Sequence, residues 1–359
     1  MIEPLAESIE LHARAQAFVT ATLQGRVPSE SFESLGAAVA SFQYRNIDGY
    51  KKLCTARGIS VEPPFSLSRM PAVPTDAFRW TRVSAFSERD TNTTFRTSGT
   101  TVKERGVHSL RTSATYDFAC VPWARAFVEP SKDERFAVLV LGPSQAELVD
   151  SSLTHMLTQF VRAWGTPESG FFVRDGVTEI EKFARVIQAL ERPALVAGTS
   201  FAFVHLLDEL GDRSLPLPSG SIVMHTGGFK GRSREVPIGE LTRSMAIAFD
   251  IPKSNVRSEY GMTELSSQFY EINTSKEGNA VYVAPAWARV IAVDPMSLAP
   301  VSDGEIGIAR IEDLLNIDSA WAVQTADRVR QLPHGFELLG RMPGSAPRGC
   351  SLSLEEILT

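Results

Sequence analysis

The stretch Phe95–Val107, FRTSGTTVKERGV, contains the first residues whose types and spacing suit chemistry on a phosphate group. Hydroxyl-bearing and small residues follow one another in it, with a lysine just beyond: Ser98, Gly99, Thr100, Thr101 and Lys103. Such a loop wraps phosphate oxygens with backbone N–H groups, hydroxyls and one cation. The GxxxxGK[ST] spacing of nucleotide hydrolases is absent, and a Thr/Ser/Gly run alone is also typical of a surface turn.

A second segment, SEYGMTELSSQFYE at Ser258–Glu271, has the residue types of a nucleotide site in a usable order. Tyr260 supplies an aromatic ring that stacks on a purine, and Gly261 lets main chain approach. Thr263 supplies a hydroxyl for the α-phosphate, and Glu264 supplies a carboxylate for Mg²⁺. In isolation, a solvated strand-to-helix turn explains the segment as well.

Two further segments suit the adenosine part of a nucleotide. Gly227 and Gly228 follow an apolar strand pattern, where a tight turn brings main chain against an adenine ring, although a plain turn explains them equally. In VQTADRVRQLPHGFELLGR, the Asp327 carboxylate suits two ribose hydroxyls, and Arg341 follows after a turn. Either residue also suits half of a surface ion pair.

The elements that must position these residues belong to an ordinary globular protein of 359 residues, 43% hydrophobic and 22% charged. The formal net charge of -6 and the lack of a clustered basic run exclude a broad nucleic-acid surface. We expect no signal peptide and no membrane span. The three cysteines, Cys54, Cys120 and Cys350, are too scattered for a disulfide framework or a zinc site, which indicates a cytoplasmic location.

Apolar patterning predicts an α/β fold. Residues 1–65 are expected to be helical and peripheral, and a Pro-rich connector follows. From Phe136 onward, short apolar runs alternate with segments of helical period, including one that starts at Val177, which predicts helix-covered β-sheets. After about residue 280, strands joined by turns predict a small β-subdomain. The predicted domains are a helical segment 1–65, a core 66–335 and a short tail 336–359.

Together the four segments resemble, in type and order, the adenylate-forming superfamily of acyl-CoA synthetases, luciferases and peptide-synthetase adenylation domains. TSGTT resembles the phosphate loop of that superfamily, YGMTE its adenine and magnesium motif, and TADR with GR its ribose motif. The short length and the ending GRMPGSAPRGCSLSLEEILT resemble the acyl-protein synthetases of the LuxE family, which activate fatty acids for reduction to aldehyde in bacterial luminescence. The resemblance spans about residues 65–359.

The resemblance implies the large N-terminal domain of an adenylate-forming enzyme that uses ATP and Mg²⁺. It implies phosphate contacts for the 98–103 loop, adenine contacts for Tyr260, phosphate and Mg²⁺ contacts for Thr263 and Glu264, and ribose contacts for Asp327 and Arg341. Thr100 is a second candidate metal ligand. The superfamily places a mobile lid domain with a catalytic lysine after the GR motif, and we expect this fold to lack it. Mg²⁺, Lys103 or Lys230 would then neutralise the pyrophosphate charge.

The resemblance also assigns the acyl acceptor to Cys350, which lies at the position where the acyl-protein synthetases carry theirs. A thiolate attacks the mixed anhydride of an acyl-AMP readily, and the neighbouring Arg348 would favour ionisation. Turn-prone residues around Cys350 predict a flexible arm. Cys54 and Cys120 are expected to be buried core residues.

The acyl pocket is less clear from the sequence. His155 follows the FAVLVLG strand, where the superfamily often places an aromatic residue or a histidine beside the acid, although a core histidine suits this position equally. Phe201 and Phe203 are candidate lining residues that a packed helix would bury in any case.

The resulting interpretation is an AMP-forming acid–thiol ligase of the long-chain-fatty-acid–protein ligase type. It would activate a carboxylic acid, in particular a fatty acid, as acyl-AMP, transfer the acyl group to Cys350, and pass it to an acyl reductase or another thiol-bearing acceptor protein. One alternative is an enzyme that acylates a carrier protein or coenzyme A without Cys350. Another is a catalytically silent nucleotide-binding module. A third is an NAD-type dinucleotide-binding enzyme, although the GxGxxG that it needs after a strand is absent.

Overall fold

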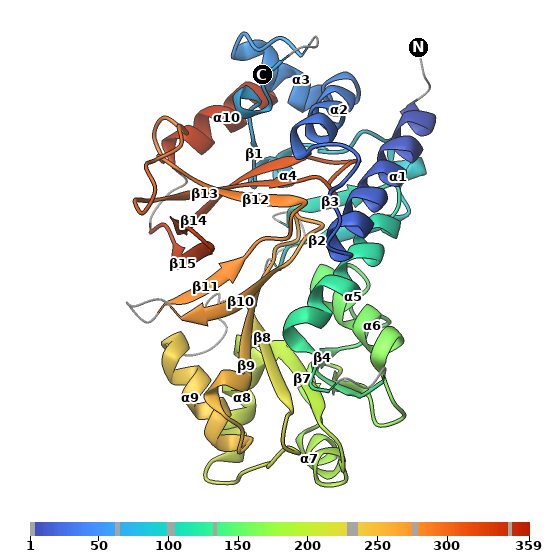
Figure 1. Cartoon of the computed structure of the whole chain (residues 1–359), viewed down its shortest axis with the longest axis vertical. Coiled ribbons are helices and arrows are strands. Elements are labelled where there is room, and N and C mark those ends of the chain that lie inside the picture. Colours follow the sequence, from blue (N-terminus) through green and yellow to red (C-terminus); the bar gives the residue numbers. More distant parts are fainter. Residues whose placement is uncertain are drawn as a thin grey trace. The chain divides into compact units, whose positions relative to one another are not determined.

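The chain forms two compact units. The computed structural model describes residues 4–61, 65–98, 105–131, 135–227, 236–274, 279–343 and 347–359 (Figure 1). The first unit comprises residues 1–119, 262–268 and 279–359, and the second comprises residues 120–261 and 269–278. The predicted division at residues 65 and 335 stays a prediction.

A mostly parallel sheet forms the centre of the second unit. Its strands, in chain order, are β4 (Ala137–Pro143), β5 (Gly170–Arg174), β6 (Val177–Thr178), β7 (Ala194–Thr199), β8 (Ile222–Thr226), β9 (Val256–Tyr260) and β10 (Phe269–Thr274). They lie in the order β10-β9-β8-β7-β4-β5-β6. The pairs β5–β4, β4–β7, β7–β8 and β8–β9 are parallel, whereas β10 and β6 are antiparallel additions at the two ends.

Helices cover both faces of this sheet, as its continuous apolar strands require. They are α5 (Ala114–Val128), which begins in the first unit, and α6 (Ser152–Trp164), α7 (Ile180–Gln188), α8 (Ser200–Leu210), α9 (Ile238–Ala248) and the short η4 (Lys253–Asn255). In Figure 1, α8 and α9 lie on one side of the strands and α6 on the other. Successive side chains of a strand point to opposite faces, so alternate residues of β4 serve the two layers.

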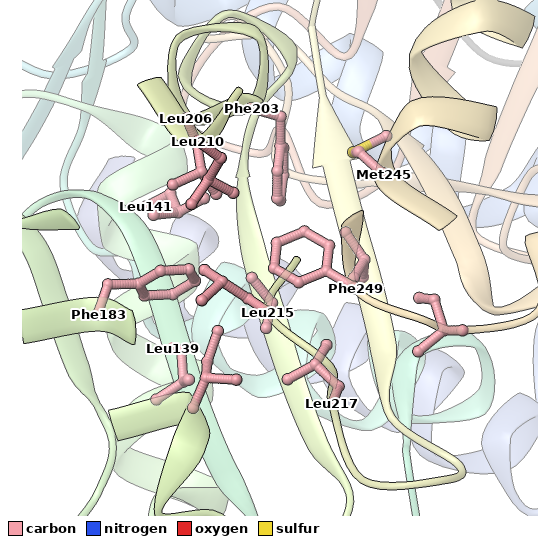
Figure 2. Close-up of a cluster of buried hydrophobic side chains, with 14 of the residues drawn as sticks. Leu139, Leu141, Phe183, Phe203, Leu206, Leu210, Leu215, Leu217, Met245 and Phe249 are labelled. Carbon is pink, nitrogen blue, oxygen red and sulfur yellow. The ribbon is translucent and has the colours of Figure 1, made fainter. Parts of the chain in front are cut away.

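Leu139 and Leu141 of β4 belong to the core on the side of α7, α8 and α9 (Figure 2). Phe249 lies at the centre of that core, with its ring 6.5 Å from that of Phe183 and 6.3 Å from that of Phe203, each in an edge-to-face arrangement. Phe203 is therefore a core residue of α8, which is the alternative that a packed helix predicts.

The helix expected from Val177 begins later, at Ile180. Val177 and Thr178 instead pair with β5 as the short strand β6, and Val177 is exposed. The turn at Asp175 and Gly176, both with positive φ, reverses the chain and makes this pairing possible.

The first unit contains an antiparallel sheet that corresponds to the predicted C-terminal strands. Its strands are β11 (Ala280–Val283), β12 (Ala288–Val293), β13 (Ile306–Asp313), β14 (Ala322–Leu332) and β15 (Gly335–Arg341), in the order β12-β13-β14-β15-β11. The two-residue β1 (Val73–Pro74) runs parallel to β14, and β2 (Thr93–Arg96) and β3 (Val107–Leu110) form a separate hairpin.

The N-terminal helices are part of this unit and make buried contacts with it, which a peripheral segment would not do. The helical elements here are α1 (Pro4–Leu23), α2 (Phe32–Asn46), α3 (Asp48–Ala56), η1 (Leu67–Arg69), α4 (Ala77–Trp80) and η2 (Glu88–Asp90). Each of α1, α2 and α3 directs a buried polar side chain into the loop between β13 and β14. His12 contacts Asp318, Gln43 donates to the carbonyl oxygens of Asn316 and Ile317, and the Tyr50 hydroxyl accepts from Trp321.

The tail forms a helix instead of the flexible arm expected around Cys350. Helix α10 (Arg348–Leu358) follows Pro347, and its buried residues Cys350, Ser353 and Ile357 recur at helical spacing. The amphipathic pattern outweighs the turn propensity of the residues before it. Across the described parts of the chain, no helix combines the length and the apolar character needed to cross a bilayer.

Truncation of the aromatic ring at the centre of the second unit should destabilise the fold strongly. We expect Phe249→Ala to lower the free energy of unfolding by about 3–5 kcal/mol, because the transfer free energy of the ring is lost and a cavity remains. Urea denaturation measures this. Ile247→Ala is the matched control, since this nearby side chain is 77% exposed, and its effect should stay within about 0.5 kcal/mol. Equal losses in the two variants would contradict the assignment of Phe249 to the core.

Candidate active site

The predicted phosphate loop connects the two strands of the β2–β3 hairpin. Gly99, Thr100, Thr101 and Lys103 lie outside the described residues, whereas Ser98 is exposed just beyond β2. The base of the loop is closed from Thr97 to Gly106, whose main-chain N–H groups each donate across the hairpin. Arg105 Nε donates to the Thr97 carbonyl oxygen at 2.6 Å. The hairpin therefore holds the loop at both ends.

Thr263 and Glu264 belong to the same unit as this hairpin, and their main chain is fixed from two sides. His108 Nδ1 on β3 donates to the Thr263 carbonyl oxygen at 2.7 Å, and Asn316 Nδ2 donates to the Glu264 carbonyl oxygen at 2.8 Å. The Glu264 residue is 6% exposed. The structure therefore brings the phosphate-loop hairpin and the Thr-Glu pair together.

The residues that follow Glu264 are bound by a buried carboxylate that sequence reasoning missed. Asp313 accepts from the Ser266 main-chain N–H at 2.9 Å and from the Ser267 hydroxyl at 2.8 Å. Burial raises the pKa of Asp313 to about 6, while these donors and the Leu315 N–H act in the opposite direction. Only its place at the end of an apolar strand, next to a Leu-Leu-Asn turn, hints at this role in the sequence.

Asp327 and Arg341 are direct neighbours across the β14–β15 pair. The hairpin at Gly335 produces this register, which shifts by an irregularity between Asp327 and Val329. Asp327 is half-buried and Arg341 is exposed. The predicted ribose residues are therefore adjacent, as a shared ligand requires.

In the second unit, the turn after β8 and the end of β9 lie beside each other, because Thr226 pairs with Glu259 in the parallel register. Gly227 has a φ of 71°, which favours glycine. Its carbonyl oxygen accepts from Ser200 Oγ at 2.8 Å. Tyr260 is buried at the end of β9, so Gly227 and Tyr260 are brought together at one edge of the sheet, and Gly228 lies outside the described residues.

Glu259 is a buried carboxyl group that the sequence analysis did not single out. It accepts a short hydrogen bond from Thr226 Oγ1, and burial raises its pKa to about 7. A Cβ atom on Gly261 would lie 2.5 Å from Glu259 Oε1, so a larger residue at this position would displace the Glu259 carboxyl group. In the sequence, the signal for Glu259 is an ionisable residue within a strand that is otherwise mostly buried.

His225 also supports the turn after β8. Its Nδ1 lies 3.0 Å from Ser200 Oγ, and burial lowers its pKa to about 4, so the ring is neutral at physiological pH. Ser200 thus relays a hydrogen bond from His225 to the Gly227 carbonyl oxygen.

His155 is a buried residue of α6, a helix that Ser151 caps by accepting from the Thr154 N–H. Its Nδ1 lies 3.0 Å from Gln145 Nε2, and its Nε2 lies 3.4 Å from Gln159 Nε2. A neutral imidazole accepts at only one ring nitrogen, so one of these amide groups donates to the ring while the other lies beside it. This arrangement suits both a substrate-orienting group and a core histidine.

Cys350 is 6% exposed and packs with Val293 and Ile308 beneath α10. Burial raises its pKa to about 11, with the carboxylate of Asp76 acting in the same direction. This is opposite to the expected effect of Arg348, because burial removes the water that would stabilise the thiolate. Cys54 and Cys120 are buried, as expected.

Solved structures of similar fold identify the fold class. Crystal structures of 2-hydroxyisobutyryl-CoA ligase in complex with 2-HIB-AMP match at TM-scores of 0.61 and 0.62, with 11% and 10% identity. The first match covers 85% of this chain and 73% of that one. The fold is that of the adenylate-forming ligases, so the α/β prediction of an adenylate-forming domain with a small β-subdomain is confirmed.

The profile of the family described as "Acyl-protein synthetase, LuxE" matches residues 33–359, and the chain belongs to this family. Two relatives are named long-chain-fatty-acid–luciferin-component ligase. The one from Aliivibrio fischeri is 21% identical over 335 residues, covering 88% of this chain and 86% of the relative. The one from Vibrio harveyi is 21% identical over 333 residues, covering 89% and 85%. The chain is an AMP-forming ligase that activates a carboxylic acid with ATP by adenylation.

Glu259→Gln should change the pH dependence of stability. Burial raises the folded-state pKa from an ordinary 4.5 to about 7, so the folded protein holds this proton more tightly than the unfolded chain. The stability contribution of the carboxyl group is therefore fully present below pH 4.5 and is lost as the pH rises through 7. Relative to the variant, the wild type should lose roughly 3 kcal/mol across this window, measured by urea denaturation at each pH.

Glu209→Gln, which replaces an exposed carboxyl group on α8, is the control for the Glu259 variant and should parallel the wild type at every pH. A Glu259→Gln curve that also parallels the wild type would show that this carboxyl group does not titrate in the window.

Proposed function

We propose that the acid activated by this chain is a fatty acid, and that the acyl group passes from acyl-AMP to Cys350 and then to a thiol of an acyl reductase. The observation that carries the proposal is the extent of the family match, since residues 33–359 include every candidate nucleotide segment and Cys350. The names of the two relatives support a long-chain fatty acid as the substrate.

In the first half-reaction, a carboxylate oxygen of the acid attacks the α-phosphorus of ATP. A new P–O bond forms, the bond to the β-phosphate oxygen breaks, and pyrophosphate leaves with the electron pair. Ser98, the loop that follows it and Thr263 bind the phosphates. Tyr260, Gly227 and Gly228 contact adenine, and Asp327 and Arg341 contact the ribose. His155 orients the acid, and Lys103 neutralises charge on the departing pyrophosphate.

Glu264 suits a Mg²⁺ ion bound together with the nucleotide. Mg²⁺ in nucleotide sites is usually held by one or two carboxylates, substrate phosphates and water. No cluster of three or more potential metal ligands occurs among the described residues, so a cage built wholly from the protein is not what this part of the chain offers. A single buried carboxylate on fixed main chain agrees with such a shared site, with Thr100 as a second ligand. Bound there, Mg²⁺ would neutralise phosphate charge.

In the second half-reaction, the Cys350 thiolate attacks the acyl carbonyl carbon, a thioester forms and AMP leaves. The thiol is protonated where it lies, because burial raises its pKa to about 11. Transfer therefore requires α10 to move so that the sulfur is hydrated and its pKa falls towards the ordinary value of about 8.5. Exchange of the thioester onto a partner cysteine would then regenerate Cys350.

The burial of Cys350 favours one second candidate function. Acyl-AMP would give its acyl group directly to a carrier protein or to coenzyme A, with Cys350 serving only as a core residue. The two functions share the adenylation step and differ in whether an acyl group is ever attached to this chain.

Glu264→Gln should abolish formation of acyl-AMP, because an amide oxygen holds Mg²⁺ far more weakly than a carboxylate. Pyrophosphate release with Mg·ATP and a fatty acid measures the rate.

Asp327→Ala, which removes a ribose contact, should mainly raise the KM for ATP and change kcat little. Wild-type rates and KM values in both variants would remove the assignment of the nucleotide site.

Cys350→Ala should eliminate a covalent acyl group without eliminating pyrophosphate release. Intact-protein mass spectrometry after incubation with Mg·ATP and a pool of fatty and aromatic acids should find a hydroxylamine-sensitive acyl mass on the wild type alone. Cys120→Ala is the control, since this cysteine is buried within α5, and it should retain the adduct. Pyrophosphate release with no adduct on the wild type would move the acceptor to another molecule and support the second candidate function.

A further inference from the structure

His108 is the residue at which the two candidate phosphate-binding segments meet. It lies on β3, directly after the base of the loop that begins at Ser98, and it pairs with Phe95 across the hairpin. Its Nδ1 lies 2.7 Å from the Thr263 carbonyl oxygen. Both partners belong to the first unit.

The chemistry of this contact determines the tautomer of the ring. A carbonyl oxygen only accepts a hydrogen bond, so Nδ1 must carry the proton. Burial lowers the pKa of His108 to about 4, although the bond to Thr263 acts in the opposite direction. The imidazole is therefore neutral at physiological pH, and Nε2 has a lone pair. Among the described residues, Nε2 has no hydrogen-bond partner.

The other contacts of this region hold the ring and the segment in place. Phe78 meets the His108 ring edge-to-face, with the ring centroids 5.7 Å apart. On the next peptide, Asn316 Nδ2 donates to the Glu264 carbonyl oxygen at 2.8 Å and to the Ala320 carbonyl oxygen at 2.9 Å. Successive carbonyl groups are thus bound by two different elements, which fixes the directions in which the Thr263 and Glu264 side chains leave the main chain.

We propose that His108 is a positioning residue for adenylation: through Nδ1 it fixes the main chain of Thr263, so that the Thr263 hydroxyl and the Glu264 carboxylate meet the phosphates. The proposal rests on the proposed nucleotide site. A neutral ring performs this task without adding a positive charge that would compete with other cations for the phosphates. Small misplacements of catalytic groups lower rates strongly.

Two amide substitutions separate the two ring nitrogens. The amide nitrogen of Asn occupies approximately the place of Nδ1, whereas that of Gln reaches approximately the place of Nε2. We expect His108→Asn to retain kcat for pyrophosphate release within about threefold, and His108→Gln and His108→Phe to lower kcat by about 100-fold. The KM for the acid should change little in all three variants.

Phe78→Leu is the structural control, because it removes the edge-to-face contact and leaves the Nδ1 bond in place. It should lower the thermal midpoint while kcat stays close to that of the wild type. If His108→Asn loses as much activity as His108→Phe, or if His108→Gln and His108→Phe both keep wild-type kcat, the proposal is wrong.

A second measurement does not depend on activity. Long-range ¹H–¹⁵N correlation spectra of histidine-labelled protein should show His108 as the Nδ1-protonated neutral tautomer at pH 7, assigned by the signal that disappears in His108→Asn. An Nε2-protonated or charged ring would overturn the proposal. Loss of activity in Glu264→Gln with full activity in His108→Phe would reject the role of His108 alone, whereas full activity in both variants would reject the nucleotide site itself.

Discussion

The hydrogen bonds of the Asn316 side chain are the interactions on which the first unit depends most directly. Its amide nitrogen donates to the carbonyl oxygens of Glu264 and Ala320, and its amide oxygen accepts from Ser266 Oγ at 2.6 Å. Buried main-chain carbonyl groups need partners, and loss of one costs about 1–3 kcal/mol. One amide therefore satisfies the segment that carries the candidate Mg²⁺ ligand and the loop that precedes β14.

This constraint connects the N-terminal helices to the site. Gln43 of α2 donates to the main chain of Asn316 and accepts from the Trp321 N–H at 2.9 Å, so α2 fixes the same loop from the other side. Asp318 in that loop is fully buried and accepts from Ser8 at 2.6 Å. A buried carboxylate is tolerated only with such donors, so α1 is held to the loop by the cost of leaving Asp318 unpaired. Helices that contain no candidate site residue thus hold the site.

The buried histidines His108 and His225 carry no charge at physiological pH. Each has a pKa lowered to about 4 by burial, in two different units. His108 binds the Thr263 carbonyl oxygen directly, whereas His225 reaches the Gly227 carbonyl oxygen through Ser200. Because a buried unpaired charge would cost far more than a neutral ring with one hydrogen bond, main-chain positioning is the role that burial permits these residues.

Much of the fold could be predicted because the local patterns agree with the tertiary structure. The apolar runs at β4, β7 and β8 are strands buried on both faces, and no helical pattern competes with them. The adjacency of Asp327 and Arg341 also follows from a recognisable hairpin. Asn316 and His108 could not be found this way, because their partners lie 52 and 155 residues away in the sequence and ordinary polar residues carry no local signal for such contacts.

Helix α10 shows the opposite failure, since turn-prone residues predicted a flexible arm where the structure has a docked helix. The spacing of Cys350, Ser353 and Ile357 buries one face, and Arg57 of the segment after α3 binds Glu356 at 2.9 Å and also contacts Ser353. The partly exposed ion pair contributes little on its own. Burial of the apolar face therefore contributes more than the ion pair to holding α10 in place, and Cys350 belongs to that face.

An acyl chain on the Cys350 sulfur would not fit where the thiol now packs with Val293 and Ile308, so acylation at Cys350 would itself favour the undocked helix. Because α10 must already undock for Cys350 to be loaded, the bound acyl group would keep the helix undocked until it passes to a partner, and the thiol would then return to the core.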